Sequence, residues 1–595
     1  MKKTNLKRIN TKMPEDGQNQ LSTPRPSILD GDAFDQLPRL PGLNIDQTTT
    51  LNNLRENSSE LSWQEHGVYG LSMNEAPKTI LSASHVDHVV NMEIETEKVA
   101  TVSTEGQVAV LRRLVKSSGF YAISSMALPL ISLVLSPFLT HNLLPSDYGI
   151  LTILNTAISL AAGITQLGLA SAFFRAYCYD YTSEHDRRDV VAVATALLCL
   201  VSIPTVILVA VTSPFLAKIL LGQSSLGGFV SLAGGVVLMQ NLTVPGLAWL
   251  RAENRPLFYS LLSISGMLIT LFANVVLVGV LHWGVAGSVI AMGSGYACIF
   301  ICTMPIIILH AGIRIRVDIA RNLLAFGLPL ILNYISYWVL QFSDRYLLSL
   351  FTSLTETARY AVPYTLGSAM AVLVIGPFTL AWPTTMFAIA RRKDAVQGFM
   401  LVFRWFSMFL LFAAFGLSLV GTFLLDWLFP VTYHSAVLII PIVAESIAFY
   451  GIYFVFMVGA NLKRKTWLTA VFTTTAALVN FVVNLILIPR YGAMGAASST
   501  LIAYIVLAFA AYIVNQRIYP IPFEIGRFFV ALFVGVALYI GSSFLALSQG
   551  TYVAWSIHVG ALALYAGCLA FLGKFPSWSQ SLDRKNGYKQ EDIVL

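Results

Sequence analysis

The sequence contains little charge. Of its 595 residues only 12% are Asp, Glu, Lys or Arg, whereas 56% are hydrophobic, and the mean hydropathy is +0.69. A soluble globular protein carries about 25% charged residues. This shortage of charge, together with many long apolar runs, excludes a soluble globular protein and predicts an all-α polytopic membrane protein.

Cysteine is also scarce, and its spacing excludes a familiar metal or disulfide framework. The five cysteines fall mostly in or beside apolar runs, without the repeated paired spacing of a zinc site: Cys178, Cys199, Cys298, Cys302 and Cys568. We interpret Cys298 and Cys302, one helical turn apart, as packing residues. We therefore expect no metal and no cofactor.

The sequence lacks a GxxxxGK[ST] nucleotide-binding loop, so we do not expect this chain to hydrolyse ATP. Any energy for its work must come from an ion gradient, from the membrane potential, or from consumption of a substrate on the far side. The formal net charge of +7 comes from basic residues at the ends of apolar spans, where they set orientation. It does not indicate nucleic-acid binding.

The first part of the chain has no sustained apolar pattern. Residues 1–108 are rich in Asn, Ser, Thr, Pro and charge, which predicts a disordered tail. The start MKKTNLKRINTKMPEDG is basic but lacks the apolar core of a secretory signal, so we predict a cytosolic tail.

About fourteen apolar stretches of spanning length follow this tail. They lie near residues 118–140, 149–173, 189–211, 226–249, 257–280, 286–309, 322–349, 359–389, 398–424, 435–459, 467–488, 493–514, 526–547 and 552–572. We predict a six-helix lobe over 109–310, a second six-helix lobe over 311–515, two extra C-terminal helices over 516–573 and a cytosolic tail over 574–595.

The loops between these spans alternate in charge. One set of alternate connections holds nineteen Lys and Arg residues near the span ends, and the opposite set holds three: Lys218, Arg359 and Arg490. Because Lys and Arg are retained on the cytosolic side, the rich set is predicted to be cytosolic. Both termini are then cytosolic as well.

The two predicted lobes share an internal repeat. Residues 274–296 (NVVLVGVLHWGVAGSVIAMGSGY) and 484–504 (NLILIPRYGAMGAASSTLIAY) both contain an Asn, an aromatic-Gly-x-x-Gly turn and a terminal Tyr. They are spans five–six and eleven–twelve, in the same orientation. This predicts a parallel repeat of six spans, as in transporters whose lobes rock about a central site.

The seventh span carries a polar stripe within ILNYISYWVLQFSDR. Asn333, Tyr337, Gln341 and Arg345 step by four residues, and Asp344 lies three after Gln341, so a helix places them along one slowly drifting face. Such groups would each cost several kcal/mol if they faced hydrocarbon. The stripe therefore predicts a helix that lines a chamber and contacts substrate. The alternative is an interfacial Asp344–Arg345 pair that only stabilises the fold.

Three further features are candidates outside this stripe. Glu445 lies about ten residues into span ten, where a carboxylate can carry a proton or sodium ion for coupling, or can simply pair with an arginine. Arg175 ends span two and can bind an anionic substrate at the cytosolic mouth. Alternatively, it is one of the basic residues that only set the orientation of the span. A milder polar face on span one is expected to oppose span seven: Tyr121, Ser125, Ser132 and Ser136.

At the level of motifs, residues 110–515 resemble the bacterial polysaccharide biosynthesis flippases of the multidrug/oligosaccharidyl-lipid/polysaccharide superfamily. The resemblance rests on the order of the segments LTHNLLPSDYGI (139–150), GLASAFFR (168–175), WLRAENR (249–255), WGVAG (283–287), Asp344-Arg345, AWP (381–383) and Asn480 to Ala497. One departure is His141, where relatives often have an arginine. Histidine is charged only when its surroundings favour protonation.

This resemblance implies a function. It implies a flippase, not an enzyme, in the bacterial cytoplasmic (inner) membrane, which moves an undecaprenyl-pyrophosphate-linked oligosaccharide outward by alternating access for O-antigen or exopolysaccharide synthesis. The implied partners are the lipid-linked glycan and other polysaccharide assembly proteins. Two alternatives stay open: an ion-coupled exporter of amphipathic drugs or other small solutes, and a membrane glycan polymerase or ligase, which the short predicted outer loops disfavour.

Overall fold

The computed structural model describes residues 132–312, 314–546 and 548–574. The predicted tail 1–108 lies outside these residues, as does all of 574–595 except Lys574. Residues 132–142 are helical, and the first group of elements follows them: α3 (Pro145–Thr165), α4 (Leu169–Arg175), η1 (Ala176–Asp180), α5 (Glu184–Leu221), η2 (Ser224–Leu226), α6 (Gly227–Ala252), α7 (Pro256–Asn274), η3 (Val275–Val280) and α8 (Gly284–Ala311).

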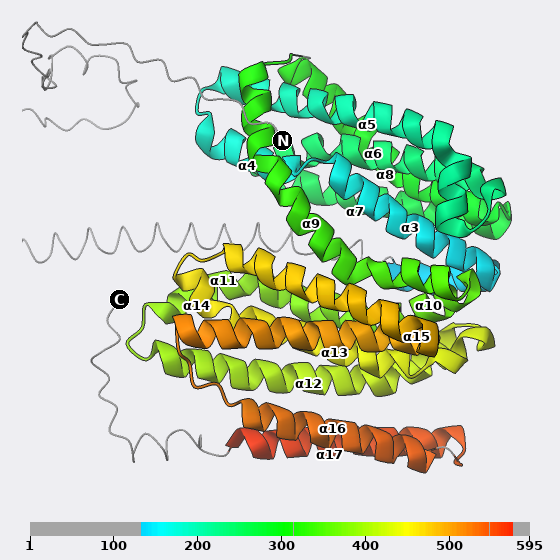
Figure 1. Cartoon of the computed structure of the whole chain (residues 1–595), viewed down its shortest axis with the longest axis vertical. Helices are drawn as coiled ribbons and strands as arrows, with labels where there is room; N and C mark the ends of the chain where they lie inside the picture. The colour runs from blue at the N-terminus through cyan, green and yellow to red at the C-terminus, as the bar shows by residue number, and fades with distance from the viewer. Residues whose placement is uncertain (1–131, 313, 547, 575–595) are drawn as a thin grey trace, which may run out of the picture. The chain divides into compact units, whose positions relative to one another are not determined.

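The second group continues with α9 (Val317–Phe351), α10 (Leu354–Met370), η4 (Ala371–Ile375), α11 (Gly376–Ala390), α12 (Ala395–Leu428), η5 (Val431–Ala436), α13 (Ile439–Phe456), α14 (Val458–Leu462) and α15 (Trp467–Ile518). The helices α16 (Ile525–Ala546) and α17 (Thr551–Lys574) pack side by side, with α16 against α12 (Figure 1). No strand occurs among the described residues.

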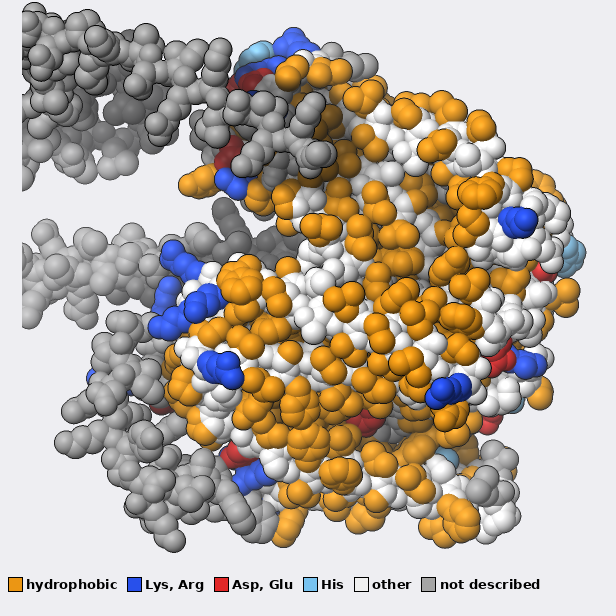
Figure 2. Space-filling model, viewed as in Figure 1, with side chains coloured by type: hydrophobic (Ala, Val, Ile, Leu, Met, Phe, Trp, Pro, Cys, Tyr) orange, Lys and Arg blue, Asp and Glu red, His pale blue; other side chains and the backbone are white. Residues whose placement is uncertain are grey.

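The prediction of an all-α polytopic membrane protein is confirmed. The described residues form twelve helices that are long and apolar enough to span a membrane. The 52-residue α15 covers two of the predicted spans, and most of the first predicted span lies outside the described residues, which accounts for the difference from fourteen. Hydrophobic side chains cover much of the visible surface of these helices (Figure 2), as expected of surfaces that face lipid.

The two copies of the internal repeat turn in the same way. Gly284 and Gly492 both have positive φ, 55° and 54°, and the second interrupts α15 with non-helical backbone. Three residues later, Gly287 and Gly495 lie against the backbone of Leu277 and Leu487, which are equivalent positions in the two copies. A side chain at Gly495 would overlap the Leu487 carbonyl, so glycine permits the close return of the next helix.

Helix α9 joins the two groups of helices. Near its start, Ile319 and Leu323 pack in a core cluster with residues of α4 to α8. Near its end, Leu340, Leu347 and Leu348 pack in the core cluster of the second group. One helix is thus buried in both groups, and the boundary predicted at residue 311 stays a prediction.

Two hydrogen bonds tie the middle of α9 to α3. The Tyr334 hydroxyl donates to the Ser159 carbonyl over 2.7 Å, and the Trp338 indole N–H donates to the Thr156 carbonyl over 3.2 Å. Two backbone carbonyls of α3, in the first group, therefore accept hydrogen bonds from side chains of α9, the helix that leads into the second group. These bonds set the spacing of two helices that line the chamber described below.

Polar contacts bring two basic loops together at one end of the first group. Arg316, just before α9, donates to Asp186 over 2.6 Å and to Asp189 over 3.2 Å, both at the start of α5. Its bonds to Asp318 and to these two carboxylates raise the pKa of the guanidinium above its usual range. The loops that hold them are both in the set predicted to be cytosolic, so the structure agrees that these loops share one side.

Candidate functional site

Two adjoining cavities lie among the described helices: the first group and Phe342 of α9 line one, and both groups line the other. The larger has a volume of about 730 Å³ and the smaller about 450 Å³. They share five lining residues: Ser132, Tyr148, Thr152, Asn155 and Phe342. We call the pair the central chamber.

Polar side chains from several helices line the central chamber. From α3 come Tyr148, Thr152 and Asn155, and from α7 come Ser263 and Thr270. Helix α10 adds Tyr364, Thr365 and Ser368. The π-helical turn η4, which follows α10 directly, continues this wall. Such π turns recur at functional sites.

Arg345 of α9 is the basic residue of the chamber wall. Its side chain is 11% exposed and lines the smaller cavity. The guanidinium donates to the Gln341 carbonyl over 2.8 Å and lies 4.5 Å from the centre of the Tyr364 ring and 5.2 Å from that of Phe342. Aromatic faces hold a cation without neutralising it, so a positive charge is presented to the chamber.

The carboxylate of Asp344, next to Arg345 in the sequence, is hydrogen-bonded to a tyrosine of α10. Asp344 is 2% exposed and does not line the chamber. Its Oδ2 accepts a hydrogen bond from the hydroxyl of Tyr360, itself fully buried on α10. The closest approach of the Asp344 carboxylate to the Arg345 guanidinium is 3.8 Å, at Oδ1. Asp344 thus lies within ion-pairing distance of Arg345 but forms no hydrogen bond with its guanidinium.

The structure brings together part of the predicted stripe. Tyr337, Gln341 and Arg345 line the smaller cavity. Asn333 does not line the chamber; it is exposed and accepts a 3.4 Å hydrogen bond from Thr473 of α15. The cause is helical drift: each step of four residues turns the side chain by about 40°, so Asn333 and Arg345 differ by about 120°.

Two other predicted features differ in their relation to the chamber. Of the polar face on the first span, Ser132 and Ser136 line the chamber opposite Phe342, while Tyr121 and Ser125 lie outside the described residues. Arg175 is 53% exposed, lies 3.5 Å from a carboxylate oxygen of Asp180 and does not line the chamber. Its predicted role at the mouth stays a prediction.

Glu445 lies in a different cavity. This space of about 300 Å³ is bounded by α12, α13, α15 and α16, and its lining is mostly apolar, with Ser418 and Tyr539 beside Glu445. The Oε2 atom of Glu445 is buried and has no hydrogen-bond partner among the described residues. Glu445 therefore faces α16 and not the central chamber.

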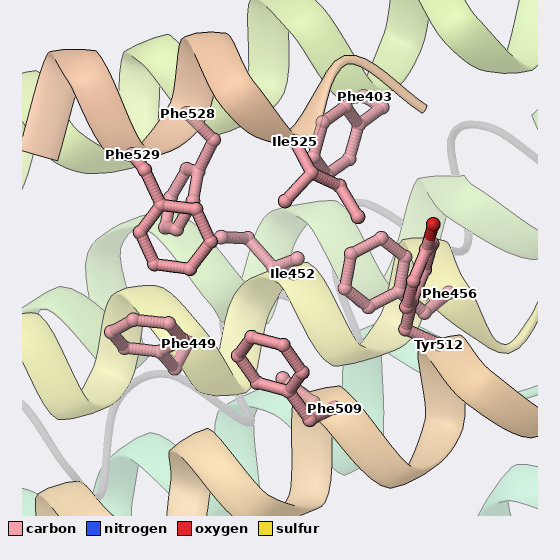
Figure 3. Close-up of a pocket in the computed structure, with 10 residues that line it drawn as sticks. Phe403, Phe449, Ile452, Phe456, Phe509, Tyr512, Ile525, Phe528 and Phe529 are labelled. Carbon is pink, nitrogen blue, oxygen red and sulfur yellow. The ribbon is translucent and has the colours of Figure 1, made fainter. Parts of the chain in front are cut away.

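A further pocket between α16 and its neighbours is wholly apolar. Phe449, Phe509, Phe528 and Phe529 gather around Ile452 (Figure 3). Its volume is only about 20 Å³. Tyr512 is among its lining residues, but the pocket exposes no polar surface to an anion.

Sequence reasoning missed most of the wall opposite Arg345. On α3 the polar residues Tyr148, Thr152, Asn155, Thr156 and Ser159 recur at helical spacing and all line the chamber. That periodicity within an apolar span is the same signal that identified the stripe on α9. A search for opposed polar stripes would have found it.

Comparison with known proteins identifies the family. The profile of a family described as "Polysaccharide biosynthesis protein" matches residues 138–438, about half of the chain. The chain belongs to this family. The matched range contains the polar lining of α3, α7 and α10 and the Arg345 site, and it ends before Glu445. No curated protein matches the chain.

Solved structures share the fold at low sequence identity. A lipid II flippase MurJ in an inward closed conformation aligns with a TM-score of 0.57 at 14% identity, over 76% of this chain and 98% of that one. A multidrug resistance MATE family transporter of the MOP superfamily, in an inward-facing conformation, aligns with a TM-score of 0.53 at 14% identity, over 67% of this chain and 97% of that one. This chain therefore shares the fold of these two proteins.

Proposed function

We propose that the protein is a flippase that moves a lipid-linked oligosaccharide across the bacterial cytoplasmic membrane by alternating access of the central chamber. Its substrate carries an undecaprenyl-pyrophosphate anchor, and the glycan serves O-antigen or exopolysaccharide synthesis. The observation that carries this proposal is Arg345, which presents its guanidinium to the chamber while Asp344 is bonded to Tyr360.

The chemistry of such a substrate fits this wall. The obstacle to flipping is the hydrophilic head, which needs a polar path through the membrane. Arginine suits a diphosphate because its planar fork donates paired hydrogen bonds and stays charged. The hydroxyl and amide groups of α3 and α10 are suited to sugar hydroxyls, and Tyr337 and Gln341 adjoin Arg345 on the same wall.

The alternative is an ion-coupled exporter of amphipathic drugs or other small solutes with the same architecture. For a cationic solute, an arginine in the chamber disfavours it because like charges repel. Catalysis is not part of the proposal. We place both termini in the cytosol from the loop charges, and other polysaccharide assembly proteins are the proposed partners. Glu445 is proposed as a site of ion coupling, since a buried carboxylate without a hydrogen-bond partner is suited to binding a proton.

Substitution of Arg345 tests this function. In a strain that lacks its own lipid-linked glycan flippase, the wild-type protein is expected to restore surface glycan, and Arg345→Ala is expected to lower export by about a hundredfold or more, because a buried charge-assisted contact to the diphosphate contributes about 1.5–3 kcal/mol per hydrogen bond. Arg345→Lys is expected to recover only part of the export, because lysine keeps the positive charge but lacks the paired hydrogen-bond donors of arginine.

The control is Arg316→Ala, which removes an arginine just before α9, at the opposite end of that helix from Arg345 and outside the chamber. It is expected to leave export near the wild-type level while lowering thermal stability. Membrane insertion of each variant is checked by its amount in the membrane fraction. Full export by Arg345→Ala would contradict the proposal, and cation export without glycan export would favour the small-solute exporter.

A further inference from the structure

Arg251 lies at the edge of the larger cavity of the chamber. It is in the last turn of α6, one turn after Leu247, which lines that cavity. Residues four apart share a helix face. Its guanidinium lies 5.6 Å from the centre of the Tyr259 ring, and Tyr259 also lines the cavity. Arg251 thus stands beside the part of the cavity at the end of the helices that is predicted to face the cytosol.

Arg251 is held in place by rings and not by carboxylates. Its guanidinium lies 4.8 Å from the centre of the Phe174 ring in addition to the Tyr259 ring. Within the described parts of the chain no carboxylate lies within ion-pairing distance of it, whereas Arg316 pairs with Asp186, Asp189 and Asp318. Its side chain is exposed. The positive charge is therefore oriented and available to an anion.

Arg345 shares the aromatic part of this setting deeper in the chamber, although its guanidinium also lies 3.8 Å from Asp344. It too lies over two aromatic rings, those of Phe342 and Tyr364. The larger cavity is lined along α7 from Tyr259 to Asn274, a separation of about 22 Å at 1.5 Å per residue. Phe342 and Tyr148 then lie at the junction with the smaller cavity, which contains Arg345. Two arginines of similar setting therefore stand toward the two ends of one continuous chamber.

We propose that Arg251 is the residue that first binds the diphosphate of the lipid-linked substrate at the mouth of the chamber, before the diphosphate reaches Arg345. This inference rests on the proposed function and adds a second anion-binding position to it. Arginine suits this position because its flat face rests on the rings while its edge donates two parallel hydrogen bonds to phosphate oxygens. A lysine keeps the charge and lacks the paired donors.

The same loop offers a matched control. Arg255 lies four residues further on, is exposed, and has its guanidinium 5.6 Å from the Trp249 ring, which does not line the chamber. Arg251→Gln and Arg255→Gln remove the same charge from the same loop. Any effect on membrane topology or on long-range attraction of anions is then common to both variants.

Binding of geranylgeranyl diphosphate to the full chain in lipid nanodiscs is the test, with inorganic pyrophosphate measured in parallel. Arg251→Gln is expected to raise Kd for both probes by about tenfold, because it removes a two-pronged charge-assisted contact. Arg255→Gln is expected to stay within about twofold, as for a residue without a direct contact. Arg251→Lys should fall between them. The lipid probe should bind more tightly than free pyrophosphate in every variant.

The outcomes separate the two proposals. If Arg345→Ala weakens binding of geranylgeranyl diphosphate and Arg251→Gln matches the wild type, the assignment of Arg251 is wrong and the flippase proposal stands. Equal losses in Arg251→Gln and Arg255→Gln would also overturn the assignment, since only loop charge would then matter. If the wild-type protein binds neither probe, or if Arg345→Ala has no effect on the lipid probe, the proposed function itself fails.

Discussion

The central chamber and the space around Glu445 are both cavities among membrane-spanning helices, yet their walls differ. The chamber has hydroxyls and amides on several helices and one arginine whose neighbouring carboxylate is bonded to Tyr360. The space beside α16 is mostly apolar and holds one carboxylate with an oxygen that has no partner in the described chain. A polar, cationic wall can accept an anionic head group. A lone carboxylate repels a diphosphate and can serve only for a proton or another cation.

On this difference we base the proposal that the two regions have separate roles. Hydrogen-bonding groups spread over α3, α7, α9 and α10 are suited to a large polar head that moves along them. A single acidic group enclosed by Phe415, Pro441 and Tyr539 is suited to one small ion. The two can communicate only through helix packing, because α13 carries Glu445 on the side that faces α16.

The larger effect is expected from the chamber. Tyr360→Phe removes the hydroxyl that engages Asp344, and a buried carboxylate that loses such a partner seeks another donor. The available donor is the guanidinium of Arg345, which lies 3.8 Å away. Once Asp344 pairs with it, Arg345 is less available to substrate, and export is expected to fall by about tenfold, the equivalent of one charge-assisted hydrogen bond.

Glycan export by Tyr360→Phe is measured in the complemented strain, with Tyr364→Phe as the control. The ring of Tyr364 also lies against Arg345, but it is the Tyr360 hydroxyl that donates a hydrogen bond to the Asp344 carboxylate. Tyr364→Phe keeps the ring under the guanidinium and should retain most of the export. Equal export by Tyr360→Phe and the wild type would show that the bond to Asp344 does not keep Arg345 available.

The smaller effect is expected from the space beside α16. Glu445→Gln keeps the size of the side chain and removes its ability to release a proton, so transport should no longer respond to an imposed ion gradient. In proteoliposomes that contain a labelled lipid-linked glycan, the variant should lose the stimulation by a pH or sodium gradient and keep a basal rate within about twofold of the wild type, since Glu445 does not touch the chamber. Unchanged dependence on the gradient would remove Glu445 from the ion pathway.

The sequence predicted the helices better than it predicted the site. Membrane spans are long and apolar, and each described span was found near its predicted position. The turn at Gly492 was also visible in the sequence through its match to Gly284, because both places require the positive φ that glycine adopts readily. The two spans within α15 are separated by non-helical backbone at Gly492, as the two predicted stretches implied.

The site was predicted in part, for a geometric reason. A four-residue repeat on one helix identifies a face only over a few turns, so Gln341 and Arg345 share the chamber while Asn333 has rotated toward α15. The position of Asp344 depends on Tyr360, and the position of Arg251 depends on Phe174 and Tyr259. Such contacts join residues from different helices. They depend on how the helices cross, and a single helical pattern contains no information on that.

The central claim is that the Gln341–Arg345 face of α9 borders a space that water and substrate can enter. The most direct measurement is the reaction of Gln341→Cys with a membrane-impermeant thiol reagent, in a protein whose five native cysteines are replaced and with reagent on both sides of the membrane. Leu340→Cys, next to it and buried at 2% exposure, is the control. The account predicts that Gln341→Cys reacts, that geranylgeranyl diphosphate slows the reaction, and that Leu340→Cys does not react. Failure of Gln341→Cys to react from either side would contradict the account.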